Sequence, residues 1–329
     1  MTIAFLLALE VVVATWLATR VLRNQVQPSP TLRAAILTAA SLLAAMLAVT
    51  EPVEVILRGP GAATVWAPTM LKHVGLLGCG VGVLLMGLAQ RPSHRARTEF
   101  VVWVWFASSA VAVTTLHVLA GGSGKRTSVE YVEWSHSQPL LVVAMLVAYI
   151  GGLVASLGFF VVIWPLRISS PAERGVAIMA VGAGFAAGWC VARVEYLRQA
   201  VWTSDPPAGA DFVITQLLSL ASIVLLTAGL VWSTAEADVR AWRSWRRFRR
   251  LHARTLAAVP AVRRSSDFRL GFDSWVADRA VEVLDALHQI VRLTGPETGF
   301  PPAPDHVGRA EVTTVVAQMG RSYDRGESR

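Results

Sequence analysis

Seven long apolar segments recur along this chain of 329 residues, and they constrain its fold more than any other feature. Each is about 20 residues long, enough to cross about 30 Å of hydrocarbon as a helix that rises 1.5 Å per residue. Transmembrane strands would alternate apolar and polar positions, and these segments do not. We therefore predict seven transmembrane helices, at residues 2–22, 32–50, 69–89, 99–119, 139–163, 175–196 and 212–233.

The composition agrees with an integral membrane protein of the all-α class. Hydrophobic residues make up 54% of the chain and charged residues only 16%, a balance that a water-soluble domain could hardly bury. Charged residues gather near the carboxyl end. We predict a transmembrane domain at residues 1–233, a basic juxtamembrane helix at 234–264 that continues the seventh span, and a small cytoplasmic helical tail at 265–329.

The orientation in the membrane follows from the basic residues of the short loops, because these favour the cytoplasmic side. One side carries Arg20, Arg23, Arg33, Arg91, Arg95, Arg97, Arg167 and Arg174, and the other carries only Arg58, Lys125, Arg126 and Arg198. The amino terminus is then outside and the carboxyl terminus cytoplasmic. Arginine far exceeds lysine, and alanine, valine and glycine are plentiful, as is typical of a high-GC genome. We therefore predict a multi-pass protein of a bacterial plasma membrane.

Ionisable side chains within the expected spans are the best indication of a functional site, because a charge at mid-bilayer costs about 2.5 to 3.5 kcal/mol. We predict an outward-facing polar cavity that binds an ion, a proton or a small polar solute. Its candidate residues are Glu10, Lys72, His73, His117, Arg193 and Glu195. The alternative is a structural ion pair between Glu10 and Arg193, with the other four side chains reaching the outer interface.

Small residues four positions apart occur in three expected spans, and such pairs let a neighbouring backbone approach closely. The pairs are Gly78 with Gly82, Gly151 with Ala155, and Gly184 with Gly188. We expect them to serve helix packing. No internal repeat is visible, so the paired inverted halves of many secondary transporters are not indicated.

The seventh span is predicted to continue as a basic amphipathic helix, because neither glycine nor proline occurs between Gly229 and Pro260. Its arginines share one arc of the helix, and its aromatic residues share another. We predict contact with anionic lipid headgroups or with a cytoplasmic protein partner through Arg240, Arg243, Arg246, Arg247, Arg250, Arg254, Trp242 and Trp245. The alternative is a stop-transfer flank with tryptophan anchors. No recognition motif for nucleic acid accompanies the charge, and none is expected to bind.

Two further helices are predicted in the tail. The first spans residues 274–293, is capped by Asp273 or Ser274, and has an apolar stripe at steps of three and four. The second spans about 307–322 and offers Val312, Val315, Val316 and Met319 at helical spacing. These helices form a small domain, or a docking site that another protein completes.

The signatures of membrane enzymes are absent from the sequence. The seventh span has no lysine for a retinal Schiff base, and the chain lacks His-Glu-x-x-His, Gly-x-Ser-x-Gly and a phosphate-binding loop. Cys79 and Cys190 lie in apolar runs without a neighbouring metal ligand. We expect no enzyme activity, no cofactor and no metal site.

The seven spans, followed by residues 242–256, Pro260 and the run Asp-Arg-Ala-Val-Glu-Val-Leu-Asp-Ala-Leu at 278–287, resemble an actinobacterial family of seven-transmembrane proteins. That family has a cytoplasmic helical domain at its carboxyl end and is regarded as transporters of unknown function. The resemblance covers most of the chain and implies no catalytic residues. We expect a transporter of a small polar solute or ion. The alternative is a membrane sensor or scaffold that relays a signal through the seventh helix to a cytoplasmic partner.

Overall fold

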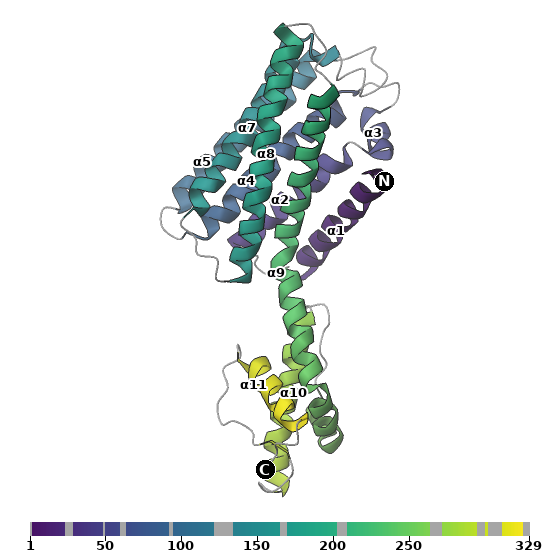
Figure 1. Ribbon diagram of the computed structural model, residues 1–329, viewed down its shortest axis with the longest axis vertical. Coiled ribbons are helices and arrows are strands. Elements are labelled where there is room, and N and C mark those ends of the chain that lie inside the picture. The colour runs from purple at the N-terminus through teal and green to yellow at the C-terminus, as the bar shows by residue number, and fades with distance from the viewer. Residues whose placement is uncertain are drawn as a thin grey trace. The chain divides into compact units, whose positions relative to one another are not determined.

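The computed structural model describes residues 2–23, 29–48, 50–59, 64–91, 95–121, 134–164, 170–202, 209–263, 272–294, 300–301 and 311–324. These residues are almost entirely helical and include no strand, so the all-α prediction is confirmed. They form two compact units, Met1–Trp232 and Ser233–Arg329, called unit 1 and unit 2 below (Figure 1). Helix α9, Gly209–Ala258, is continuous, and the division between the two units falls within it.

Unit 1 contains the membrane-spanning helices. Besides the first part of α9, it holds α1 (Thr2–Arg23), α2 (Pro30–Leu47), α3 (Glu51–Arg58), α4 (Ala67–Ala89), α5 (Arg95–Ala120), α7 (Pro139–Ile163) and α8 (Pro171–Trp202). Six of these, α2, α4, α5, α7, α8 and α9, are long and apolar enough to cross a membrane. The protein is therefore a multi-pass integral membrane protein. The remaining expected span, residues 2–22, corresponds to α1, a helix of 22 residues in which Glu10–Thr19 forms a shorter apolar stretch.

Helix α3 is an element that the sequence patterns did not predict. Glu51 and Pro52, which follow the second span, begin this short amphipathic helix. Proline is compatible with a first helical turn, because its missing N–H has no partner there in any case. Glu54 pairs with Arg58 one turn later, and the helix ends at Gly59, whose φ of 66° suits glycine.

Helix α4 lies at the centre of unit 1, where it contacts α2, α5, α7 and α8. Its glycines allow the close approach of α2: a Cβ atom at Gly75 would lie 2.8 Å from the Ser41 carbonyl oxygen, and one at Gly82 would lie 2.8 Å from the Thr38 nitrogen. By contrast, many apolar side chains of α5, such as Phe100 and Trp103, are exposed. Such a surface suits lipid rather than water.

Another close helix approach in unit 1 joins α8 to α9. A Cβ atom at Gly175 would lie 2.7 Å from the Gly229 carbonyl oxygen. At Gly188, one of the predicted packing residues, a Cβ atom would lie 3.8 Å from Leu218, which is an ordinary contact. Small residues four positions apart in one helix therefore predicted the α2–α4 contact. The α8–α9 contact depends instead on one glycine in each of two helices, which spacing within a single helix does not reveal.

Unit 2 is a small helical domain. It consists of the rest of α9, a short 3₁₀ helix at Pro260–Val262, α10 (Phe272–Thr294) and α11 (Val312–Asp324). Its core contains Phe248 and Leu251 of α9, Val283 and Leu287 of α10, and Val316 of α11. The predicted juxtamembrane helix at 234–264 and the predicted tail at 265–329 thus both contribute residues to this core.

One predicted helix boundary in unit 2 was wrong. Helix α10 begins at Phe272, so Asp273 lies in its first turn, and neither Asp273 nor Ser274 is the cap. The aromatic ring of Phe272 packs against the unit 2 core, which accounts for the earlier start. Helix α11 spans Val312–Asp324, and the start predicted near residue 307 falls among residues 302–310, outside the described part of the chain.

Candidate functional site

Unit 1 contains a partly open cavity of about 990 Å³. Helices α1, α2, α4, α7, α8 and α9 all contribute to its wall. This volume is at the upper end of the range of about 300 to 1,000 Å³ that small-molecule sites occupy. Most lining side chains are apolar, and the polar ones are Glu10, Thr50, Lys72, Ser156, Arg193, Thr215, Gln216, Ser219 and Ser222. We call this space the unit 1 cavity.

Three charged residues lie on the wall of the unit 1 cavity. Glu10 comes from α1 and is only 7% exposed, Lys72 lies in the second turn of α4, and Arg193 lies in α8. Within the described residues, no ion pair joins Glu10 to Arg193, and neither cation has a carboxylate within 4 Å. The structural ion pair considered as an alternative is therefore not formed.

Aromatic rings surround the guanidinium group of Arg193. Its Cζ atom lies 5.9 Å from the ring centroids of Tyr149 and Trp189 and 5.4 Å from that of Tyr196. These contacts fix the cation against the electron-rich faces of the rings. They do not satisfy all of its donors, because Nε of Arg193 is buried without a hydrogen-bond partner in the described part of the chain.

A buried histidine pair lies behind the charged wall. Nδ1 of His73 in α4 is 3.3 Å from Nε2 of His117 in α5, and Nε2 of His73 is 3.4 Å from the Tyr149 hydroxyl in α7. His73 is 2% exposed and His117 1%. Each contact needs one donor and one acceptor, which neutral imidazole rings can supply. The cluster thus ties three spanning helices together next to Arg193.

A second, smaller pocket of about 30 Å³ adjoins this cluster. Its lining includes Lys72, His73, Tyr149 and Arg193, together with His136 from the segment before α7. Such a space can hold about one or two water molecules. Lys72 and Arg193 line both the small pocket and the unit 1 cavity, so these two cations lie between the two spaces.

Glu10, Lys72 and Arg193 line the unit 1 cavity, and His73 and His117 form the cluster beside it, whereas Glu195 belongs to neither. Its exposed carboxylate binds Arg198 through two hydrogen bonds of 2.6 and 2.7 Å and also accepts one from Gln199. Two helical positions separate Glu195 from Arg193, a rotation of about 200°, so the two side chains leave opposite sides of α8. The expectation that Glu195 lines the cavity is therefore not met.

Several residues of the site were not identified from the sequence. Tyr149, Trp189 and Tyr196, the aromatic neighbours of Arg193, are ordinary in an apolar span. The polar stripe that α9 presents to the cavity was detectable, because its members recur at helical spacing. These residues are Thr215, Ser219 and Ser222.

The basic segment of α9 exposes all six of its predicted contact arginines: Arg240, Arg243, Arg246, Arg247, Arg250 and Arg254. Trp242 is also exposed, and Arg246 lies 4.8 Å from its ring centroid. Trp245 differs, because it is half-buried, packs against the unit 2 core and lies 4.9 Å from Trp275, ring centroid to ring centroid. Only part of its side chain is therefore exposed for the predicted lipid or partner contact.

The packed face of this helix has a signal in the sequence. Ala241, Trp245, Phe248, His252 and Thr255 recur at steps of four and three, the spacing of a helical face that packs against other helices. The spacing alone does not identify what covers this face, which in the structure is α10 and α11.

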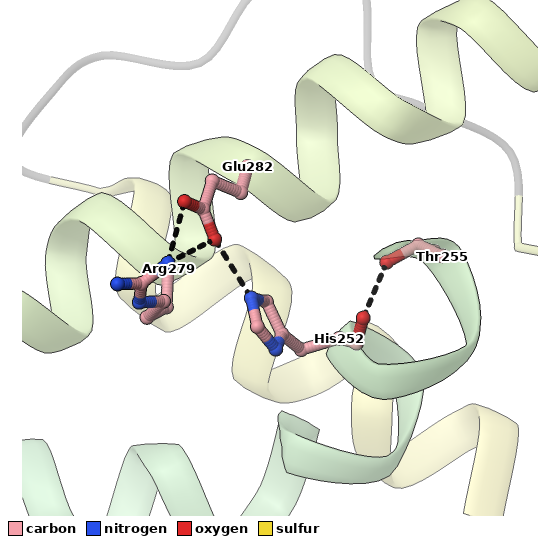
Figure 2. A network of polar contacts seen from close by, with 4 residues as sticks. All are labelled: His252, Thr255, Arg279 and Glu282. Carbon is pink, nitrogen blue, oxygen red and sulfur yellow. Dashed lines mark hydrogen bonds and ion pairs between the residues drawn. The ribbon is translucent and has the colours of Figure 1, made fainter. Parts of the chain in front are cut away.

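Unit 2 contains a buried polar network that joins α9 to α10 (Figure 2). Nε2 of His252 is 2.8 Å from a carboxylate oxygen of Glu282, and Arg279 donates to both oxygens of the same carboxylate at 2.6 and 2.8 Å. Glu282 is 1% exposed. Its charge is therefore fully accommodated, which is the pattern of a structural ion pair rather than of a vacant site.

Comparisons of this chain with protein families, with characterised proteins and with solved structures find no match. The resemblance to an actinobacterial transporter family therefore stays a prediction, and the argument for function depends on the geometry of the unit 1 cavity. Among the described residues, no group of three or more His, Cys, Asp or Glu side chains is placed to hold a metal ion.

Proposed function

We propose that this integral membrane protein is a transporter that binds a small polar solute or ion in the unit 1 cavity. The observation that carries the proposal is the position of Lys72 and Arg193 on the cavity wall, with no carboxylate partner in the described residues. An unpaired charge in a membrane protein is costly and marks a site where something else supplies the partner.

The proposed orientation makes this an outer cavity of a bacterial plasma-membrane protein. With the amino terminus outside, Glu10, Lys72 and Arg193 all lie in the outer halves of their helices. In this orientation the small pocket beside His136 also lies toward the outer ends of the helices. Glu10 supplies an acceptor for a proton, a cation or a donor group of the solute.

Flux into proteoliposomes tests this function. We expect pH-gradient-driven or solute-gradient-driven movement by the full-length protein, and its loss in Glu10→Gln at normal expression. Glu195→Gln is the matched control, because it removes an equivalent carboxylate from an exposed position of unit 1. Glu10→Gln protein that folds and still moves solute at the normal rate would rule out a role for this carboxylate.

A sensor or scaffold is the second candidate function, and the continuity of α9 favours it. The same helix lines the cavity through Ser219 and Ser222 and supplies Phe248 and Leu251 to the unit 2 core. Affinity capture on the full-length protein, with and without residues 234–329, separates the two functions. A stoichiometric cytosolic partner without flux supports the sensor, whereas flux that survives removal of this segment contradicts it.

The exposed arginines of α9 support a contact with anionic lipid or with a protein partner. Arg240 lies eight residues beyond Trp232, about 12 Å along the helix, whereas Arg254 lies about 33 Å along it. Arg240 and Arg243 are thus the better candidates for lipid headgroups, and Arg250 and Arg254 for a partner. Co-sedimentation with vesicles that contain anionic lipid is expected to weaken in the double variant Arg240→Gln, Arg243→Gln and not in Arg250→Gln, Arg254→Gln.

A further inference from the structure

We infer that the ligand of the unit 1 cavity is an amphiphilic anion, with a carboxylate or phosphate group between Lys72 and Arg193 and an apolar body along the cavity wall. This inference rests on the proposed function only in taking the cavity as the ligand site. It replaces the small polar solute or ion of that proposal with a different chemical class of ligand, an amphiphilic anion, and it leaves open whether the protein is a transporter or a sensor.

The charges of the wall indicate an anion. Lys72 and Arg193 carry two positive charges, and Glu10 is the one charged residue of opposite sign among the lining residues that the structure describes, so one positive charge is in excess. The two cations border the same spaces, where they repel each other unless an anion lies between them. A single oxyanion satisfies both requirements.

The state of Arg193 indicates an oxyanion in particular. The faces of three aromatic rings hold its guanidinium group in place, and ring faces neutralise no charge. Its Nε donor is buried and has no partner among the described residues. A guanidinium group presents its donors in a planar fork that fits the two oxygens of a carboxylate or phosphate. Arg193 is thus positioned before its ligand arrives.

The rest of the wall indicates an apolar body. Beyond the charged end, the lining includes Leu42, Met46, Leu76, Val83, Leu220 and Leu226, from α2, α4 and α9. A volume of about 990 Å³ is far larger than a bare inorganic anion needs and matches a drug-sized molecule. Apolar walls bind an apolar chain by removing it from water. A small hydrated anion would leave most of this surface without contact.

The experiment measures binding to the full-length protein in discs of zwitterionic phosphatidylcholine, by isothermal titration calorimetry. The probes are octyl phosphate and octanoate, with inorganic phosphate and acetate as headgroups alone, and octyltrimethylammonium as an amphiphile of opposite charge. We expect octyl phosphate or octanoate to bind at least ten-fold more tightly than its headgroup alone, and octyltrimethylammonium not to bind. Equal affinity for octyl phosphate and inorganic phosphate would overturn the apolar body, and preference for the cationic amphiphile would overturn the anion.

Variants locate the binding in the cavity. Lys72→Gln and Arg193→Gln are each expected to weaken octyl phosphate binding at least ten-fold, whereas Arg198→Gln, which removes an exposed arginine of the same helix, leaves it unchanged. Arg193→Lys keeps the charge without the planar fork and is expected to recover part of the affinity. It is also the variant to use if Arg193→Gln fails to fold. Unchanged binding in all three cavity variants would place the ligand elsewhere and overturn the inference.

Two further measurements complete the experiment. One identifies the source of the ligand, and the other distinguishes failure of this inference from failure of the proposed transport. Phosphatidylglycerol in the discs competes with octyl phosphate if the natural ligand is a membrane lipid, and does not if it is a free amphiphile; either result retains the amphiphilic anion. Flux of a non-amphiphilic solute without octyl phosphate binding overturns this inference and leaves the proposed transport intact. Binding without flux overturns transport and leaves the ligand class intact.

Discussion

The two units place their charged side chains in opposite surroundings. In unit 2, Glu282 is almost fully buried and is bound by both Arg279 and His252 (Figure 2). In unit 1, Lys72 and Arg193 border a large cavity, and no carboxylate of the described residues pairs with them. Removing one partner from a buried, fully paired charge is costly, because the other is left uncompensated, whereas a charge without a partner in the fold is available to an external one. The comparison therefore separates a structural network from a candidate binding site.

The strongest test of this comparison is the removal of Glu282. We expect Glu282→Ala to destabilise unit 2 by about 3 to 5 kcal/mol, because Arg279 and His252 would be left without their anion in a buried position. Hydrogen exchange of the full-length protein, followed by mass spectrometry, is expected to show lost protection in α10. Asp273→Asn, at an exposed position of the same helix, is the control. If α10 kept its protection in Glu282→Ala, the network would not be what holds α9 and α10 together.

The second test concerns what holds unit 1 together in the absence of such a network. Gly82→Ala is expected to lower the stability of unit 1 by about 1 to 3 kcal/mol, because the added Cβ would lie 2.8 Å from the Thr38 nitrogen of α2. Gly188→Ala is the matched control, with a Cβ 3.8 Å from Leu218. The measurement is the thermal unfolding midpoint in detergent. Equal midpoints for the two variants would contradict a fold that depends on the close α2–α4 contact.

Sequence predicted the features that are visible within one segment of the chain, and it did not predict those that depend on which helices are neighbours. Six spans were predictable, because bilayer thickness imposes an apolar length that is visible in the residues themselves. The candidate residues Lys72, His73, His117 and Arg193 were also predictable, since ionisable groups are conspicuous in an apolar run. That His73 contacts His117, 44 positions away, depends on which helices are neighbours, and that information is not local in the sequence.

Two features that sequence did not predict have the same origin. Glu195 and Arg193 lie at similar depth in α8, yet depth does not give the side of the helix from which a side chain leaves. The contact of Trp245 with Trp275 joins residues 30 positions apart on two different helices. In both cases the missing information is the direction in which a side chain faces, and the spacing of residues at steps of three and four along a helix gives part of it.

The third test removes a charge of unit 1 that has no carboxylate partner in the described residues. Its expected effect on the free energy of unfolding is opposite to that of Glu282→Ala in unit 2. Lys72→Met is expected to leave the free energy of unfolding unchanged or to raise it by up to about 1 kcal/mol, because no partner is orphaned and a charge near the membrane is removed. Thermal unfolding in the absence of ligand is the measurement. A loss as large as that of Glu282→Ala would mean that Lys72 is structural, and the distinction between the two units would fail.

The smallest effect is expected where charge is paired but exposed. Glu236 and Arg240 form an ion pair of 2.7 Å on the surface of α9, in unit 2. Because water screens such a pair, Glu236→Gln should cost only about 0.3 to 0.5 kcal/mol, roughly a tenth of the loss expected for Glu282→Ala. Hydrogen exchange of the two variants under the same conditions shows whether the stability of unit 2 depends on the presence of a charge pair or on the burial of that pair. If both lowered protection equally, burial would not be the property that makes the Glu282 network structural, and the absence of partners around Lys72 and Arg193 would lose its force as evidence for a ligand.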